Sequence, residues 1–112
     1  MRSRSVRHAI EVFSLLLGLA APALGQPHRI VLLYDERTEL PGLAALDVRL
    51  GQALAAGLPD VEMYREAMDL SRFKSDTYPT RLKDFLREKY ADKHIDVVIA
   101  AMGPALDFML AH

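Results

Sequence analysis

Three short segments of the chain carry apolar residues in patterns typical of β-strands. Ile30–Tyr34 is apolar throughout, and Ile95–Ala101 is apolar except for Asp96. Continuous apolar runs of this length predict strands that are covered on both faces, as in a parallel sheet. Val61–Ala67 alternates apolar with polar residues, which predicts a strand near the edge of the same sheet.

The segment between the first two predicted strands has leucines at helical spacing. A helix is predicted over Leu43–Ala56, opened by Pro41 and ended by Gly57 and Pro59. Its apolar face comprises Leu43, Leu46, Leu50 and Leu54, and its opposite, polar face comprises Asp47, Arg49 and Gln52.

Two further helices are predicted after the second and third strands. One covers Thr77–Tyr90, with Pro79 tolerated in its first turn. The other follows the turn Met102-Gly103-Pro104. The apolar face of the helix over 77–90 comprises Leu82, Phe85, Leu86 and Tyr90.

This alternation of strands and helices predicts an α/β fold with a parallel sheet of the Rossmann-like or flavodoxin-like type. Right-handed crossovers place the first strand between the other two, which gives the strand order 2-1-3. A parallel sheet needs neighbouring strands and helices on both faces, and the third strand and its helix would lack such neighbours. We therefore expect residues 26–112 to be the incomplete amino-terminal part of a larger domain.

The first 25 residues have the organisation of a secretory signal peptide. Arg2, Arg4 and Arg7 precede an apolar stretch over Val12–Leu24, which ends in small residues. This stretch is shorter than the ~20 residues that a membrane-spanning helix needs. We expect cleavage after Gly25 and a periplasmic or otherwise extracytoplasmic location, with membrane attachment only if the segment stays uncleaved.

Composition narrows the classes of partner and cofactor. The whole chain has a formal net charge of −1, and residues 1–25 contain three Arg and one Glu, so the remainder carries about −3. A mildly acidic chain without a basic patch does not favour nucleic acid. The sequence contains no cysteine, which excludes disulfides and thiolate metal sites. The four histidines are scattered without metal-ligand spacing, so we expect no metal and no cofactor.

Candidate chemistry lies where the predicted strands end, because ligands in open parallel sheets bind beyond the carboxyl ends of the strands. Asp35-Glu36 follows the first strand, Asp69 and Arg72 follow the second, and Met102-Gly103-Pro104 follows the third. Glycine lets a backbone approach a ligand closely, and a helix start offers free N–H groups to carboxylates, phosphates or hydroxyls. The Gly-Pro turn is equally compatible with a plain helix start, and Asp69 with Arg72 is compatible with a simple salt bridge in a loop.

No catalytic residue is predicted. Asp35 and Glu36 are two acids at a strand end, but no His or Lys partner lies near them in the sequence. The nucleotide-binding patterns GxGxxG and GxxxxGK[ST] are absent, as is the hydrolase pattern GxSxG.

Residues 28–54, 61–90 and 95–110 together resemble the first lobe of a periplasmic solute-binding protein of the ABC-transporter type. The resemblance is particularly to the version fused to bacterial sensor histidine kinases as an extracytoplasmic sensor domain. It depends on the loop Met68–Phe73, on the pattern LxxKY over Leu86–Tyr90, and on IDVVIA followed by GPAL within 95–106.

The resemblance implies two α/β lobes that close on a small-molecule ligand, with residues 26–112 forming part of the first lobe. It implies that the cleft-facing, ligand-binding residues are Tyr34, Asp35, Met102, Gly103 and Pro104. The segment itself would not be an enzyme. Its partner would be an ABC permease in transport or a fused histidine kinase in two-component signalling.

Two other classes are compatible with such a sheet. A receiver-like phosphoacceptor domain would have an acidic pair after the first strand, as Asp35 and Glu36 provide, but it also needs an aspartate that closes the third strand. Here that place reads Ala100-Ala101-Met102, and the next carboxylate is Asp107. An exported α/β enzyme is the other alternative, and it would need a nucleophile and base at the same edge of the sheet.

Overall fold

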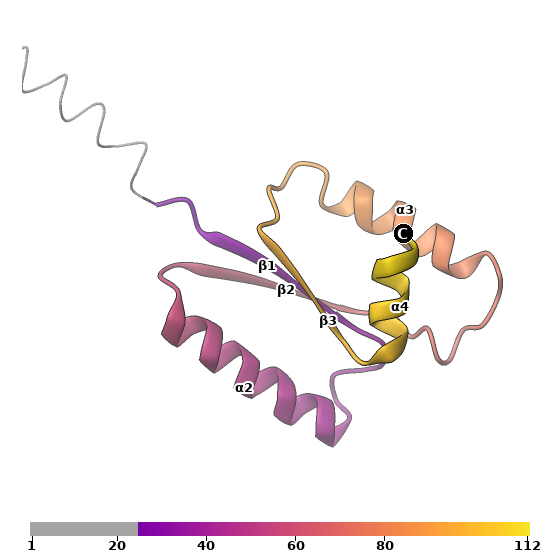
Figure 1. The fold of residues 1–112 in the computed structure, drawn as a ribbon, viewed down its shortest axis with the longest axis horizontal. Helices are drawn as coiled ribbons and strands as arrows, with labels where there is room; N and C mark the ends of the chain where they lie inside the picture. Colours follow the sequence, from indigo (N-terminus) through magenta and orange to yellow (C-terminus); the bar gives the residue numbers. More distant parts are fainter. Residues whose placement is uncertain (1–24) are drawn as a thin grey trace, which may run out of the picture.

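The structure, a computed structural model, describes residues 25–112. The predicted signal peptide therefore lies outside the described residues, apart from its last residue, Gly25. Three strands, β1 (His28–Tyr34), β2 (Val61–Ala67) and β3 (Val97–Ala101), form one parallel sheet in the order β2-β1-β3 (Figure 1). This confirms the α/β fold and the strand order predicted from the sequence.

The three strands end at the same level of the sheet. In the register of the ladders, Tyr34 of β1 is the partner of Ala67 in β2 and of Ala101 in β3. The connections that follow the three carboxyl ends are thereby brought to one edge of the sheet. This is the edge at which open parallel sheets bind ligands.

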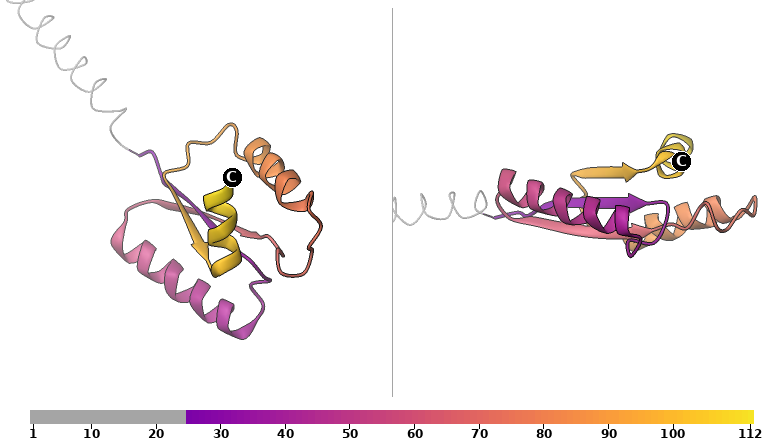
Figure 2. Two further views of the ribbon diagram at one scale, coloured as in Figure 1. Left: turned by 45° about the vertical axis from the view of Figure 1, so that its right-hand side comes forward. Right: turned by 90° about the horizontal axis from the view of Figure 1, so that it is seen from below.

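Helices cover both faces of the sheet. Helix α2 (Pro41–Gly57) lies on one face, and α3 (Tyr78–Lys89) and α4 (Gly103–Ala111) lie on the other (Figures 1 and 2). Each helix has a proline in its first turn, where the missing N–H is tolerated. Within residues 25–112, no helix combines the length and the apolarity that crossing a membrane requires.

Strand β1 is the centre of the core. Its side chains point alternately to the two faces of the sheet, and its last five residues are at most 4% exposed. Toward α2 the buried residues are Ile30, Leu32, Tyr34 and Leu43. Toward α3 and α4 they are Val31, Leu33, Met68, Ala105 and Phe108. Burial on both faces explains why the last five residues of this strand, 30–34, form a continuous apolar run.

Strand β3 differs from the sequence-based expectation in length and in exposure. It begins at Val97 rather than at Ile95. The carboxylate of Asp96 accepts a hydrogen bond from the backbone N–H of Arg29 at 2.8 Å, so a side chain takes the place of a ladder bond there. Val97 and Val98 are 48% and 39% exposed, because no described element lies beside the outer edge of β3.

Two residues predicted on the apolar faces of helices are exposed instead. Leu46 in α2 is 43% exposed and Phe85 in α3 is 55% exposed. The Lys89 ammonium lies 5.8 Å from the centre of the Phe85 ring, which gives that ring a partner at the surface. The other predicted residues of α3, namely Leu82, Leu86 and Tyr90, pack against the core.

Candidate functional site

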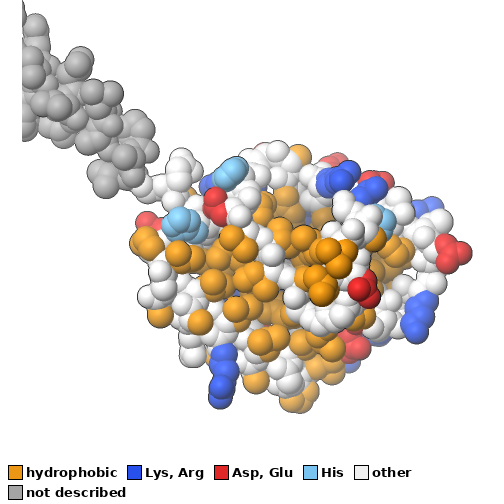
Figure 3. All heavy atoms as spheres, viewed as in Figure 1, with side chains coloured by type: hydrophobic (Ala, Val, Ile, Leu, Met, Phe, Trp, Pro, Cys, Tyr) orange, Lys and Arg blue, Asp and Glu red, His pale blue; other side chains and the backbone are white. Residues whose placement is uncertain are grey.

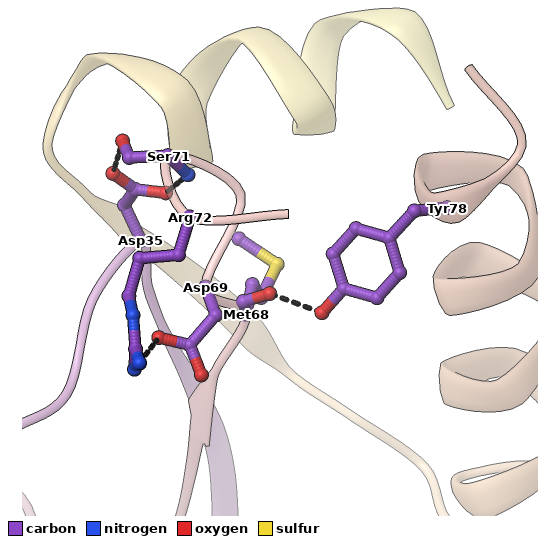
Figure 4. Close-up of polar contacts among 6 residues, drawn as sticks. All are labelled: Asp35, Met68, Asp69, Ser71, Arg72 and Tyr78. Atoms are coloured by element: carbon purple, nitrogen blue, oxygen red, sulfur yellow. Dashed lines mark hydrogen bonds and ion pairs between the residues drawn. The ribbon is translucent and has the colours of Figure 1, made fainter. Parts of the chain in front are cut away.

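The candidate site is the edge where the three strands end. Asp35 follows β1, a loop from Met68 to Thr77 joins β2 to α3, and Met102 joins β3 to α4. The last backbone bond between β1 and the loop runs from the N–H of Met68 to the carbonyl of Tyr34, at 2.8 Å. Figure 4 shows the polar contacts that hold the loop in place beside the end of β1.

Asp35 is the anchor between β1 and this loop. Its side chain is buried, with the residue 1% exposed. One carboxylate oxygen accepts a hydrogen bond from the Ser71 backbone N–H at 3.0 Å, and the other accepts from the Ser71 hydroxyl (Figure 4). Both oxygens are thus engaged by one residue of the loop, so Asp35 positions the loop and does not present a free carboxylate to a ligand.

The loop itself is a compact turn built on Asp69, whose backbone has a positive φ of 53°. Its carbonyl accepts hydrogen bonds from the N–H groups of Arg72 and Phe73, both at 3.0 Å. The Asp69 carboxylate lies 3.4 Å from the Arg72 guanidinium, which is the salt bridge that the sequence allowed. This pair is exposed enough that it contributes little to stability on its own.

Tyr78, at the start of α3, fastens the other side of the loop. Its hydroxyl donates a hydrogen bond to the carbonyl of Met68 (Figure 4). Burial, together with the negative charge of Asp69, raises the pKa of Tyr78, so the phenol stays protonated and remains a donor. Nothing in the spacing of the sequence distinguished Tyr78 as a residue of this edge.

Tyr34 is fully buried and points toward α2 rather than beyond the strand end. Its hydroxyl donates to Asp47 at 2.8 Å. Burial, reinforced by this bond to a carboxylate, raises the pKa of Tyr34 to about 12. The Tyr34 hydroxyl, which was predicted to bind a ligand, is therefore hydrogen-bonded to a residue of α2 on one face of the sheet.

Asp47 lies on the sheet side of α2, which corrects the expectation that it belongs to the polar face. Besides the Tyr34 hydroxyl, its carboxylate accepts from the Arg65 guanidinium of β2 at 2.6 Å. Burial alone would raise the pKa of Asp47, but the bonds from Arg65 and Tyr34 outweigh it and lower that pKa overall. The cluster joins α2, β1 and β2 through charge-assisted hydrogen bonds.

Met102 has the most unusual backbone of the edge. Its φ is 78° and its ψ is 158°, a combination that residues with a β-carbon rarely adopt. Its side chain is half exposed, at 51%. Strain of this kind costs on the order of 1–3 kcal/mol and persists where the surroundings hold it, often at ligand sites. Of the predicted site residues, Met102 therefore carries the clearest structural sign of a function.

Gly103 and Pro104 begin α4 directly after this strained residue. No side chain caps the helix, and its first bonded amide is that of Leu106, which donates to the Met102 carbonyl at 3.1 Å. The N–H groups of Gly103 and Ala105 thus lack a helical partner, and they carry the partial positive charge of the helix start. A β-carbon built on Gly103 would meet no atom within 4 Å, so the space above the turn is open.

Two grooves border α4. One of about 470 Å³ lies between α4 and the loop after β2, with Leu70, Phe73, Pro104 and Phe108 among its lining residues. The other, of about 510 Å³, lies between α3 and α4 over the sheet, with Leu33, Leu86, Val98 and Met109 among its lining residues. Only the first adjoins the strained turn, so it is the one that a ligand at the strand ends would use.

Of the three histidines of the described chain, His112 follows α4 and lines both grooves, and the other two lie elsewhere. His28 begins β1 and His94 precedes β3, both at the amino ends of the strands, and His94 lies 3.3 Å from the Asp96 carboxylate. Residues 25–112 contain no group of three acidic or histidine side chains placed to hold a metal ion.

Comparison with known proteins gives no match: no family model, no curated protein and no solved structure is significantly similar to this chain. Function is therefore inferred from the geometry at the strand ends.

Proposed function

We propose that this protein is a non-enzymatic, extracytoplasmic binding module for a small molecule, and that the ligand lies against the carboxyl edge of the sheet. The observation that carries this proposal is the backbone of Met102, held in a conformation natural to glycine between the end of β3 and the open start of α4. Strain at such a position is explained if the turn is shaped for a ligand.

The geometry favours a ligand with an acceptor group, such as a carboxylate, a phosphate or a hydroxyl. The N–H group of Gly103, which lacks a helical partner and is exposed, would bind that group, and the open space over Gly103 would admit it. The remainder of the ligand would lie in the adjoining groove near Leu70 and Phe73. Such sites commonly combine a few convergent polar groups with apolar walls.

The predicted residues at this edge would then have different roles. Met102, Gly103 and Pro104 would contact the ligand directly. Asp35 would support them indirectly, because its bonds to Ser71 hold the loop that forms one wall of the groove. Tyr34 would act from the α2 face by fixing the end of β1.

The biological setting follows from the resemblance to solute-binding lobes. A second lobe would close over this edge, and only a ligand that favours the closed arrangement would change the population of states. The closed module would deliver its ligand to an ABC permease or would signal through a fused histidine kinase. Export through the predicted signal peptide over residues 1–25 would place it in the periplasm or outside the cell.

A thermal-shift screen tests the proposal with a panel of small carboxylates, sugars and aromatic compounds. A compound that binds the folded protein raises its melting temperature as it saturates the site. We expect at least one acceptor-bearing compound to do so, and we expect Gly103→Val to weaken its affinity about tenfold or more, which is about 1.4 kcal/mol.

Gly57→Val is the matched control for that variant. Gly57 also lies in a helix with no atom within 4 Å of a built β-carbon, but it ends α2 at the opposite end of the sheet. It should leave the affinity unchanged. Equal affinity in a folded Gly103→Val protein, or no shift with any compound of the panel, would contradict the proposal.

A further inference from the structure

The residue that would begin the mature chain is a glutamine. Cleavage after Gly25 makes Gln26 the first residue, and Pro27 follows it. A glutamine at a free amino terminus differs from an internal one, because its α-amine and its side-chain amide can react with each other. Their reaction closes a five-membered lactam, pyroglutamate. Gln26 is therefore a candidate site of covalent modification.

The structure leaves Gln26 accessible. Residues 25–27 precede β1 and belong to no helix or strand, and Gln26 is exposed. Within the described chain, backbone bonding to the rest of the fold begins at His28, whose N–H donates to the carbonyl of Asp60 at 2.8 Å. A processing enzyme and solvent can therefore reach Gln26 while β1 stays in the sheet.

The lactam ring is compatible with the path of the chain into β1. It contains only the backbone nitrogen, the α-carbon and the side-chain carbons of Gln26. Pro27 restricts the residue before it to extended backbone. The ψ angle of Gln26 lies outside the ring, so closure of the ring leaves this extended entry unchanged.

The surroundings of Gln26 contain no acid that a terminal ammonium would have to give up. A pocket of about 370 Å³ at the amino ends of the strands is lined by Gln26, Pro27, His28, Arg29, His94 and Asp96. Figure 3 shows histidine and charged side chains gathered where the described chain begins. Asp96 is the one acid among these lining residues. One of its oxygens accepts from the Arg29 N–H at 2.8 Å, and the other lies 3.3 Å from His94 Nε2, so both are engaged without the α-amine.

We propose that Gln26 is a modification site and that the mature chain begins with pyroglutamate. This inference rests on the export and cleavage proposed above, because the nitrogen of Gln26 is a non-nucleophilic amide nitrogen until residues 1–25 are removed. Part of an ordinary α-amine is unprotonated at neutral pH. This form attacks the side-chain carbonyl carbon, Cδ, of the same residue, where proximity favours the reaction.

The atoms of this step balance without a co-reactant. A bond forms between the backbone nitrogen and Cδ, and the bond between Cδ and Nε2 breaks. The side-chain nitrogen leaves as ammonia, together with the proton that the amine gives up. Nothing is oxidised or reduced. The product is a neutral amide, so the mature protein has one positive charge fewer than a chain with a free terminus.

The modification has a consequence outside the cytoplasm. Aminopeptidases act on a free α-amine, and proteolysis concentrates at exposed chain ends. Pyroglutamate removes that amine two residues before His28 fastens the chain to Asp60. Cyclisation therefore protects the entry into β1 from trimming.

Mass spectrometry tests the proposal on the full chain, expressed in a bacterial host and analysed in the periplasmic and cytoplasmic fractions. We expect the periplasmic protein to have the mass of residues 26–112 less one ammonia, and fragmentation of its amino-terminal peptide to place the loss at Gln26. Residues 26–112 with a glutamine that stays intact through prolonged incubation at neutral pH would overturn the modification but not the export.

The remaining outcomes also separate the two proposals. An exported chain that begins at another residue would overturn the modification alone. This includes a chain that begins at His28 because Gln26 and Pro27 have left as a cyclic dipeptide. An uncleaved chain confined to the cytoplasm would overturn the export as well.

Gln26→Asn is the matched control. Asparagine carries the same amide one carbon closer to the backbone, so the corresponding lactam would be a strained four-membered ring that does not form. The variant should be cleaved at the same bond, keep its full mass and react with an α-amine label. The sequence has one other glutamine, Gln52. Loss of ammonia from Gln26→Asn as well would assign the loss to another residue and overturn the proposal.

Discussion

At the scale of single residues, Met102 connects structure with proposed function. A residue with a β-carbon at φ 78° and ψ 158° is strained, and the chain retains methionine there although glycine would adopt the same backbone freely. The methionine side chain is half exposed beside the open space over Gly103. We interpret the strain as the cost of holding an apolar contact surface at the ligand edge.

Replacing Met102 with glycine should therefore stabilise the protein. Relief of strain of about 1–3 kcal/mol exceeds the extra flexibility of glycine in the unfolded chain, about 0.4–1 kcal/mol, so the expected net gain is about 1 kcal/mol. Urea unfolding measures it. Met102→Ala keeps the β-carbon and should show no such gain. A Met102→Gly protein less stable than the alanine variant would show that the backbone is not strained.

The raised pKa of Tyr34 leads to a prediction of how the stability of the protein depends on pH. Its pKa is about 12 in the folded protein against 10.0 for an ordinary tyrosine. Since the folded state holds the proton more tightly, the stability from the neutral phenol is complete below pH 10 and is lost as the pH rises through 12. Tyr34→Phe should make the loss of stability over this range smaller, as measured by urea unfolding at several pH values.

The same variant has an effect at neutral pH, because it removes the hydrogen bond to Asp47. The expected loss is about 1 kcal/mol. If the unaltered protein and Tyr34→Phe lose stability equally between pH 10 and 12, the buried phenol is not the group that titrates.

At the scale of elements, the sequence pattern was enough to locate every helix and strand of residues 25–112. Strand β1 is apolar at each buried position, and β2 was predicted within the bounds that the structure shows. Periodicity reports which residues share a face, but it does not report which part of that face another element covers. This is why the exposure of Leu46, Phe85 and Val97 was not predicted.

The spacing of Asp47 in the sequence already places it on the apolar side of α2, although the prediction assigned it to the polar face. It lies four residues after Leu43 and three before Leu50, a spacing that places all three on one side of a helix. A carboxylate on the apolar side of a helix needs a partner. Arg65 and Tyr34 supply it, on strands that only the folded chain brings near.

The packing of α2 gives a prediction at this scale. Leu43 is 8% exposed and faces β1, whereas Leu46 is 43% exposed on the same helix. Leu43→Ala should destabilise the protein by about 2–5 kcal/mol, because it leaves a cavity under the sheet. Leu46→Ala should cost less than about 1 kcal/mol. Chemical unfolding compares the two variants, and equal losses would mean that α2 packs in another orientation.

At the scale of the whole molecule, the proposed ligand site lies at the edge of the sheet formed by the turns that follow the three strands. Parallel topology was sufficient to predict where the strand ends meet. It was not sufficient to predict that Ser71 hydrogen-bonds both carboxylate oxygens of Asp35 or that the backbone of Met102 is strained. Both features depend on how loops distant in sequence pack against one another.

The most direct test of the central claim is a map of the ligand on the folded protein. Amide chemical shifts of the ¹⁵N-labelled chain would be recorded during titration with the strongest binder of the panel. The account predicts the largest changes at Met102 and Gly103, with smaller ones at Ser71 and Arg72 in the neighbouring loop. Changes confined to the groove between α3 and α4, at Leu86 and Val98, would contradict it.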